Sequence, residues 1–308
     1  MFEKLFGTSD GLKDMLPKVR GQYIENVKLA KYTWFGVGGP AEVLFLPKDT
    51  DDLKTFLVRK PQAVPVTIIG GGSNLLIRDG GIPGVVIRLD APEFSKITFN
   101  GTEVTLGAGL RNADLKKELI KRGVGGLEFI CSVPGRIGGL IRTNAGCFNR
   151  SVDEVLVKAH IMNEWGEVYE VGAEDFNFKY RSSMFPDNWI VLDVTLKGIE
   201  SKPEEIQKII DEQAEYRKAH QPINKKTAGS TFKNPEGLAA WKLISEAGCK
   251  DLKVGGAEVS DMHCNFLINN GKATAEDIEN LGEMIVEKVK EKTSITLEWE
   301  VRRMGVKK

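Results

Sequence analysis

The chain has 308 residues, of which 41% are hydrophobic and 28% charged, so it is long enough for two or three domains around ordinary globular cores. Its 43 basic and 43 acidic residues cancel, which excludes a global field that would attract nucleic acid or an anionic membrane. No apolar run reaches the roughly 18 residues of a membrane span, and residues 1–22 lack a secretory-signal core, so we expect a cytoplasmic protein with no nucleic-acid or membrane partner.

The first region, in chain order, predicts a helix over 49–60 and buried strands over 64–69 and 84–89. The helix has acidic residues in its first turn and basic ones in its last, which suits the helix dipole. The first strand leads directly into the run Gly70-Gly71-Gly72-Ser73-Asn74.

The second region opens with a predicted hairpin over 97–106, in which Asn100-Gly101 suits a tight type I′ turn. Asn112 is then expected to cap a helix that ends at Gly123. A glycine-rich stretch over 125–146 follows, then a hairpin over 157–171 around Trp165-Gly166 and a buried strand over 189–196.

The third region predicts three helices and a final strand. Ser201 and Glu204 form an expected capping-box pair, with Pro203 in the first turn of a helix that runs to about residue 220. A second helix spans 238–247, and a third begins at Thr274 with Asp277 as its capping partner. A strand over 295–304 closes the chain.

Cysteine and histidine spacing favours neither disulfides nor a metal site. The cysteines form no CxxC pair and are interpreted as reduced, mostly buried thiols. They are Cys131, Cys147, Cys249 and Cys264. The three histidines lack metal-ligand spacing, so we expect no metal.

Two glycine-rich segments carry the functional signal, namely 70–76 and 133–146. Glycine lets backbone approach a ligand closely and present successive N–H groups, which suits a pyrophosphate. No Gly-Lys-Ser/Thr or Gly-x-Gly-x-x-Gly pattern is present, so the two commonest nucleotide folds are disfavoured. The alternative is that both segments are turns that simply need glycine.

Five motifs resemble one family. Ile69 to Leu76 is similar to the pyrophosphate loop of the vanillyl-alcohol-oxidase-type FAD fold, and Val133 to Gly139 with Asn144 to Gly146 is similar to its second FAD loop. The runs 180–185, 228–235 and 297–302 narrow the resemblance to the UDP-N-acetylenolpyruvoylglucosamine reductase (MurB) family, in its shorter subtype without a tyrosine-bearing insertion. The similarity covers roughly residues 32–305.

The resemblance implies an α+β chain that combines a two-subdomain FAD-binding fold with a C-terminal α+β substrate domain. It implies FAD and NADPH as cofactors and reduction of the enolpyruvyl ether of a UDP-amino-sugar, in peptidoglycan synthesis. The expected divisions are 1–90, 91–200, 201–297 and a C-terminal strand 298–308 that returns to the flavin. A monomer is expected.

The resemblance also assigns residues to FAD. The expected cofactor contacts are Gly70, Gly71, Gly72, Ser73, Asn74, Leu75, Val133, Pro134, Gly135, Gly138, Gly139, Asn144, Ala145 and Gly146.

Three residues are expected to be catalytic. Arg181 would bind the substrate carboxylate or the developing enolate with a permanent positive charge. Ser230 would donate the proton. Glu300 would act as a protonated or Arg181-bonded acid, although strand alternation places Glu298 on the same face and the spacing alone does not choose between them.

Second-rank candidates for substrate contact are Tyr180, Lys233 and Asn234, while Asn234 could equally be a turn former beside Pro235. His263 is interpreted as structural.

Three positions depart from the family pattern. Gly36 stands where arginine is usual, which puts a charged contact from that loop in doubt. Trp299 replaces a usual proline. Arg136 replaces a small residue, and we hypothesise that it contacts a phosphate.

Two other functions compete with the reductase. One is a flavoprotein oxidase or dehydrogenase of the same fold, which often carries a covalent flavin. The other is a non-catalytic nucleotide-binding protein, which only the glycine-rich loops support.

Overall fold

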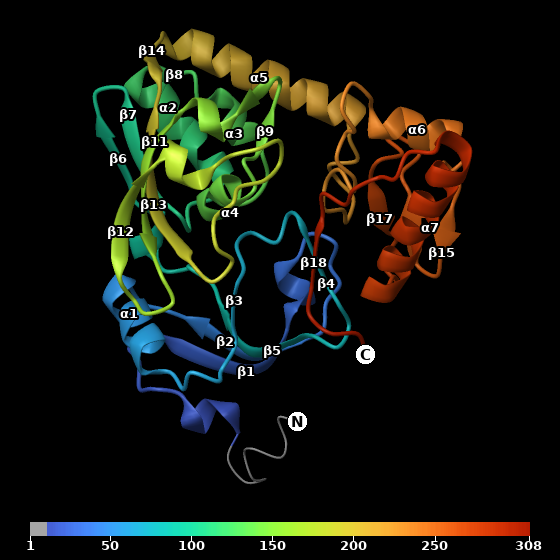
Figure 1. The fold of residues 1–308 in the computed structure, drawn as a ribbon. Coiled ribbons are helices and arrows are strands. Elements are labelled where there is room, and N and C mark those ends of the chain that lie inside the picture. Colours follow the sequence, from blue (N-terminus) through green and yellow to red (C-terminus); the bar gives the residue numbers. More distant parts are fainter. Residues whose placement is uncertain (1–10) are drawn as a thin grey trace.

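The structure is a computed structural model that describes residues 11–308. The expectation about a signal segment and the start of the first predicted division therefore lie partly outside the described residues. Helices and sheets are mixed along the described chain, as the α+β class predicts (Figure 1).

The first sheet has the strand order β1-β2-β5-β3. Its strands are β1 (Gln22–Lys28), β2 (Pro40–Leu46), β5 (Ile82–Ile87) and β3 (Val66–Ile68). Helix α1 (Thr50–Arg59) packs beside it through the buried Leu53 and Phe56. The helix starts as predicted, because the Asp49 carboxylate accepts the Asp52 N–H at 2.9 Å.

The second sheet is antiparallel and has the order β12-β11-β13-β7-β6. Its strands are β6 (Ile97–Asn100), β7 (Glu103–Gly107), β11 (Leu156–Met162), β12 (Val168–Gly172) and β13 (Ile190–Lys197). One face is covered by α2 (Leu115–Arg122), α3 (Glu128–Ser132) and α4 (Ile137–Arg142) (Figure 1). Short strand pairs join β9 (Gly146–Cys147) to β10 (Arg150–Ser151) and β8 (Val124–Gly125) to β14 (Ile199–Glu200).

Two local expectations in this region are wrong. The first hairpin turns at Gly101-Thr102, because Asn100 pairs with Glu103, and Gly101 alone has a positive φ there. Asn112 does not cap α2 but is fully buried, and its Nδ2 donates to the Val133 carbonyl at 3.0 Å. A tertiary partner thus outcompetes the local capping bond for this side chain.

The C-terminal unit contains α6 (Ala240–Glu246), α7 (Ala275–Thr293) and a small sheet of β15 (Lys253–Val254), β16 (Ala257–Val259) and β17 (Leu267–Asn269). The Thr274–Asp277 capping box on α7 is confirmed. The 18-residue helix α5 (Pro203–His220) runs across the top of Figure 1 from the second sheet towards this unit. Its predicted capping box is wrong, because the Ser201 hydroxyl donates to Glu205 and no side chain caps the helix.

The end of the chain returns to the first region. Only β18 (Arg302–Met304) is regular, and it pairs in parallel with β4 (Leu75–Ile77), so the strand predicted over 295–304 is mostly irregular. The buried core of the C-terminal unit includes Phe35 and Leu76 from the first region. The segment after residue 297 is therefore held directly beside the first glycine-rich loop.

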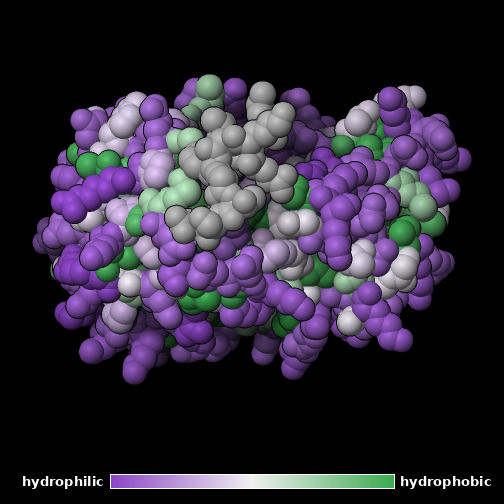
Figure 2. Space-filling model, turned by 90° about the horizontal axis from the view of Figure 1, so that it is seen from below, coloured by the Kyte–Doolittle hydropathy of each residue, from purple (hydrophilic) through white to green (hydrophobic). Residues whose placement is uncertain are grey.

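The molecular face seen in Figure 2 is mainly hydrophilic where described side chains show, with hydrophobic ones in small scattered groups. Among the described residues, no helix combines the length and hydrophobicity needed to cross a bilayer.

Candidate functional site

One large cavity of about 810 Å³ lies where the two sheets, the end of α5 and the C-terminal unit meet. Both glycine-rich segments contribute to its lining, together with residues 180–181, 228–230, 300 and 302–304. Of the predicted site residues, the structure brings the following to its wall: Gly70, Gly71, Gly72, Ser73, Asn74, Leu75, Val133, Pro134, Gly135, Gly138, Gly139, Ala145, Gly146, Tyr180, Arg181, Ser230, Asn234 and Glu300. The cavity volume is in the range of small-molecule and cofactor sites.

The first loop leaves β3 and exposes its backbone to this cavity. Within the described chain, the N–H groups of residues 70–73 donate to no backbone or side-chain acceptor. Successive unpaired N–H groups form a nest for an anion, and a pyrophosphate fits this donor set. A Cβ on Gly72 would lie 1.8 Å from the Tyr32 carbonyl oxygen, so the loop path requires glycine.

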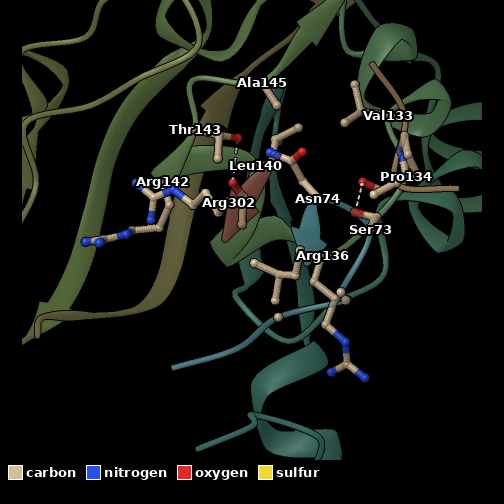
Figure 3. A pocket seen from close by; sticks show the side chains of 18 of the residues that line it. Ser73, Asn74, Val133, Pro134, Arg136, Leu140, Arg142, Thr143, Ala145 and Arg302 are labelled. Atoms are coloured by element: carbon tan, nitrogen blue, oxygen red, sulfur yellow. Dashed lines mark hydrogen bonds between the residues drawn. The ribbon is translucent and has the colours of Figure 1, made fainter. Parts of the chain in front are cut away.

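The two glycine-rich loops brace one another. The Ser73 hydroxyl donates to the Pro134 carbonyl at 3.0 Å, drawn as a dashed line between these two residues in Figure 3. A Cβ on Gly71 would lie 2.9 Å from the Gly135 Cα, so the two backbones touch. Asn112 fixes the second loop from behind, since its N–H also donates to the Gly135 carbonyl at 3.1 Å.

The Arg136 side chain lines the cavity but is bonded to several protein groups. Its Nη1 donates to the Leu89 and Gly109 carbonyls, each at 2.9 Å, and its Nη2 lies 2.8 Å from Asp90. Burial lowers the pKa of this guanidinium and Asp90 opposes that shift. Figure 3 shows the side chain pointing away from Ser73 and Pro134. Arg136 thus ties the second loop to residues 89–90 and 109, and its hypothesised phosphate contact stays a prediction.

Asn144, an expected cofactor contact, lies behind the wall instead of on it. It is only 3% exposed. Its Nδ2 donates to the Lys179 carbonyl and its Oδ1 accepts the Asp153 N–H, both at 3.1 Å. Asn144 thus supports the segment that carries Arg181.

Arg181 and Glu300 meet across the cavity from positions far apart in the chain. Arg181 Nε lies 3.3 Å from Glu300 Oε1, and Arg181 Nη2 donates to the Gly146 carbonyl at 2.7 Å. The Arg181 backbone has a φ of 54°, in the left-handed region that non-glycine residues rarely occupy. Backbone hydrogen bonds between Lys179 and Ser182, at 2.9 and 3.1 Å, close the tight turn that holds it there. Such strain is typical of functional positions.

The environment of Glu300 favours its neutral form. Burial raises the pKa of the Glu300 carboxyl and outweighs the opposing charges of Arg181 and Lys233. Two hydrogen bonds hold the Glu300 backbone: its N–H donates to the Thr231 carbonyl at 2.8 Å, and its carbonyl accepts from Asn74 Nδ2 at 3.1 Å.

Glu298 and Glu300 lie on different sides, contrary to the expectation from strand alternation. The segment is paired only at Trp299, which bridges Phe232, so no regular strand imposes the period of two. Glu298 is 72% exposed and its Oε1 accepts from Lys233 Nζ at 2.5 Å. Only Glu300 lines the cavity.

Ser230 is held by the C-terminal unit. It follows Gly229, whose φ is +80°, and its backbone bridges Phe266. Asn265 fixes the next two residues: its carbonyl accepts the Thr231 N–H at 2.7 Å, its Oδ1 accepts the Phe232 N–H at 3.0 Å, and its Nδ2 donates to the Phe232 carbonyl at 2.9 Å. Sequence reasoning did not single out Asn265, because these partners are tertiary.

The second-rank candidates differ in placement. Tyr180 lines the cavity, and its ring lies 5.0 Å below the Arg181 guanidinium. Asn234 also lines it, although its Oδ1 accepts the Ala240 N–H at 3.0 Å and so ties the residue 234 turn to α6. Lys233 lies outside the wall in its pair with Glu298.

Other departures from the family pattern are accommodated locally. The Lys226 side chain covers Gly36, where a Cβ would lie 3.1 Å from Lys226 Cδ. Trp299 packs on Phe232 and donates to Glu283 at 3.1 Å, without displacing Glu300.

His263 packs against Trp241 and Phe266, and burial lowers the pKa of its imidazole.

Cavity arginines were missed by sequence reasoning. Arg142 and Arg302 extend side by side in Figure 3 and both contact Asp187, with Arg302 Nη1 at 3.6 Å from its carboxylate. Arg302 ends the family run 297–302 but was given no role there, and the contacts with Asp187 join α4, β18 and a loop. Within residues 11–308, no cluster of three or more His, Cys, Asp or Glu side chains is arranged to hold a metal ion.

Comparisons with known proteins indicate one enzyme family. The family model described as UDP-N-acetylenolpyruvoylglucosamine reductase, C-terminal domain, matches residues 221–304, and the model described as FAD binding domain matches residues 41–172. A UDP-N-acetylenolpyruvoylglucosamine reductase from Paramagnetospirillum magneticum is 48% identical over 296 residues, 96% of each chain. One from Bradyrhizobium sp. is 47% identical with the same coverage.

Solved structures agree. The crystal structure of UDP-N-acetylenolpyruvylglucosamine reductase (MurB) from Thermus caldophilus superimposes with a TM-score of 0.80 and 35% identity. The alignment covers 94% of this chain and 100% of the Thermus chain.

Proposed function

The chain belongs to the UDP-N-acetylenolpyruvoylglucosamine reductase family, and from this membership we propose that Arg181, Ser230 and Glu300 carry the substrate half of its reaction. The protein is an FAD-dependent oxidoreductase of peptidoglycan synthesis that uses NADPH to reduce the enolpyruvyl group of UDP-N-acetylenolpyruvoylglucosamine to UDP-N-acetylmuramate. It has the vanillyl-alcohol-oxidase type of FAD-binding fold with a C-terminal substrate domain.

The residues of the cavity fit FAD. We assign the pyrophosphate to the unpaired N–H groups of residues 70–73, and the remaining contacts to Asn74, Leu75, Val133 to Gly135, Gly138, Gly139, Ala145 and Gly146. Bound FAD supplies the redox chemistry, passing hydride from NADPH to the substrate double bond. The protein must orient the substrate, neutralise charge and deliver a proton.

Arg181 is assigned to charge neutralisation. Reduction of an alkene that carries a carboxylate places negative charge on the adjacent carbon and that carboxylate. A guanidinium is permanently charged and offers parallel N–H donors for such a group. Its position in the cavity wall, held by Gly146 and by the tight turn at 179–182, supports a preorganised site.

Ser230 Oγ is assigned as the proton donor, and Glu300 as a neutral neighbour of Arg181. An ionised Glu300 would repel the developing enolate, and the raised pKa of its carboxyl avoids this repulsion. We assign Tyr180 and Asn234 to substrate contact. Lys233 is proposed to act at longer range through its charge, because its Nζ is bonded to Glu298.

The proposed divisions follow the chain: FAD-binding parts at 1–90 and 91–200, a substrate part at 201–297, and the returning segment 298–308. The pairing of β18 with β4 supports the last assignment. We also propose a cytoplasmic monomer that supports cell shape and division through cell-wall synthesis.

One observation carries the site assignment: Arg181 and Glu300 are in contact in a cavity whose other walls are the two glycine-rich loops. The test is a visible spectrum of the purified holoenzyme, followed by anaerobic NADPH and then substrate. We expect a flavin spectrum that NADPH bleaches and the enolpyruvyl substrate restores. A colourless protein, a flavin that stays attached after denaturation, or a bleached flavin that substrate leaves unchanged would contradict the function.

A further inference from the structure

Arg217, in the last turn of α5, reaches the cavity with much of its hydrogen-bonding capacity unused. Its Nη1 donates to the Ser132 carbonyl and its Nε donates to Gln221 Oε1 at 2.9 Å. All three residues line the cavity. Within the described chain, Arg217 Nη2 donates to no protein group.

The other cavity arginines all have carboxylate partners. Six arginines line the cavity: Arg136, Arg142, Arg181, Arg217, Arg302 and Arg303. Five of them pair with an acidic side chain: Arg136 with Asp90, Arg142 and Arg302 with Asp187, Arg181 with Glu300, and Arg303 with Glu279 and Glu283. Arg217 alone has no acidic side chain within ion-pair distance in residues 11–308.

A purely structural role leaves this charge unexplained. A link between α5 and α3 already exists, because the Ser132 hydroxyl donates to Gln213 at 2.8 Å. Burial lowers the pKa of the Arg217 guanidinium, and no carboxylate of the described residues offsets that cost. Burying a cation costs less free energy when an anion pairs with it.

The position of Arg217 indicates which kind of anion would reach it. Arg217 and Arg181 both lie in the cavity wall, and the charge of each opposes the burial that raises the pKa of the Cys147 thiol to about 11. Cys147 follows Gly146, whose carbonyl binds Arg181. A ligand with two separated anionic groups would therefore meet two cations along this wall.

We propose that Arg217 binds a phosphoryl group of a nucleotide ligand in this cavity. The proposal rests on the proposed function, because FAD, NADPH and the UDP-sugar all carry such groups. A guanidinium binds phosphate through charge-assisted N–H donors, and the unused Nη2 leaves such donors available.

The experiment compares Arg217→Gln, which removes the charge, with Arg217→Lys, which keeps it. Lys208→Gln is the matched control, because Lys208 lies on the same helix but is 74% exposed and outside the cavity wall. Dissociation constants are measured by calorimetry for FAD binding to flavin-free protein, and for NADP⁺ and UDP binding to holoenzyme. Thermal midpoints of all variants are recorded in parallel.

We expect Arg217→Gln to weaken one of the three ligands by about 10- to 100-fold, the range for loss of a charge-assisted hydrogen bond. Arg217→Lys should recover part of that loss and Lys208→Gln should show none. The ligand whose dissociation constant rises identifies the source of the phosphate: FAD, NADPH or the substrate.

Two results would overturn the inference. One is that all three dissociation constants stay within about twofold of wild type. The other is that all three weaken equally with a lowered thermal midpoint and no rescue by lysine, which would mark a structural link. If wild-type holoenzyme completes its bleaching and recovery cycle, either result leaves the proposed function intact.

Discussion

Asn74 Nδ2 donates to the Glu300 carbonyl oxygen at 3.1 Å and so joins the first glycine-rich loop to the segment that bears the buried carboxyl, 226 residues away. The parallel pairing of Leu75 with Arg302 continues this junction. Flavin binding and the placement of Glu300 are therefore expected to depend on one another.

Asn74→Ala should weaken both FAD binding and the attachment of the segment that bears Glu300. Loss of this hydrogen bond should lower the free energy of unfolding of flavin-free protein by about 0.5–1.5 kcal/mol and reduce FAD affinity. Chemical denaturation and titration with FAD measure the two effects. An unchanged FAD dissociation constant would show that the junction does not shape the flavin site.

Arg181→Ala should slow the substrate half-reaction by ~10²–10³-fold, the effect of removing a preorganised charge. NADPH-driven bleaching should change little. Stopped-flow absorbance separates the two half-reactions.

Arg181→Gly is the matched control for the backbone. Because residue 181 has a φ of 54°, glycine should relieve strain and be about 0.5–1 kcal/mol more stable than alanine there, while both lack the charge. Equal stability of the two variants, or a substrate half-reaction at the wild-type rate in either, would contradict this account of Arg181.

Asn265→Ala should impair the substrate half-reaction by releasing the segment after Ser230. It removes two hydrogen bonds to Phe232 and leaves buried backbone groups unpaired, which should cost about 2–4 kcal/mol of folding free energy. Substrate reoxidation should slow more than NADPH bleaching. Asn270→Ala, which changes an exposed amide just after β17, is the control and should change neither half-reaction. Equal slowing of both half-reactions would assign Asn265 to general stability.

The raised pKa of Glu300 predicts a pH dependence with a definite sign. Folded protein retains a proton that the unfolded chain loses near the ordinary glutamic acid pKa of 4.5. Between that value and the raised pKa, folded protein binds more protons, so this group makes the free energy of unfolding fall as pH rises. The substrate half-reaction should slow as pH rises through the raised pKa, when Glu300 becomes charged.

Glu300→Gln should remove this dependence from both measurements, because the amide does not titrate. Denaturation and stopped-flow series over pH measure it. A wild-type pH profile that persists in Glu300→Gln would assign the ionisation to another group.

Much of the architecture followed from local patterns. The Thr274–Asp277 box, the helix predicted over 49–60 and the strand that leads into Gly70 depend on neighbouring residues, and the structure contains all three. The glycine runs also mark cavity walls, because only glycine tolerates the close approach at positions 71 and 72.

The incorrect predictions concern residues whose contacts are made with residues far away in the sequence. Asn112 looks like a helix cap locally, but its side chain donates to the distant Val133 carbonyl instead. Glu298 and Glu300 separate because residues 298–300 form no regular strand. Asn265 and Arg217 carry no sequence signature, since their importance arises only from what the fold places beside them.

The most direct test of the three-residue site is anaerobic stopped-flow of Ser230→Ala beside Thr231→Val. The Thr231 hydroxyl is buried, has no hydrogen-bond partner among residues 11–308 and lies outside the cavity wall, so it is a matched neighbouring hydroxyl. We predict that NADPH bleaches both variants at the wild-type rate, and that substrate restores the flavin normally in Thr231→Val but far more slowly in Ser230→Ala. Normal restoration in Ser230→Ala, or equal slowing of its two half-reactions, would contradict proton donation by Ser230.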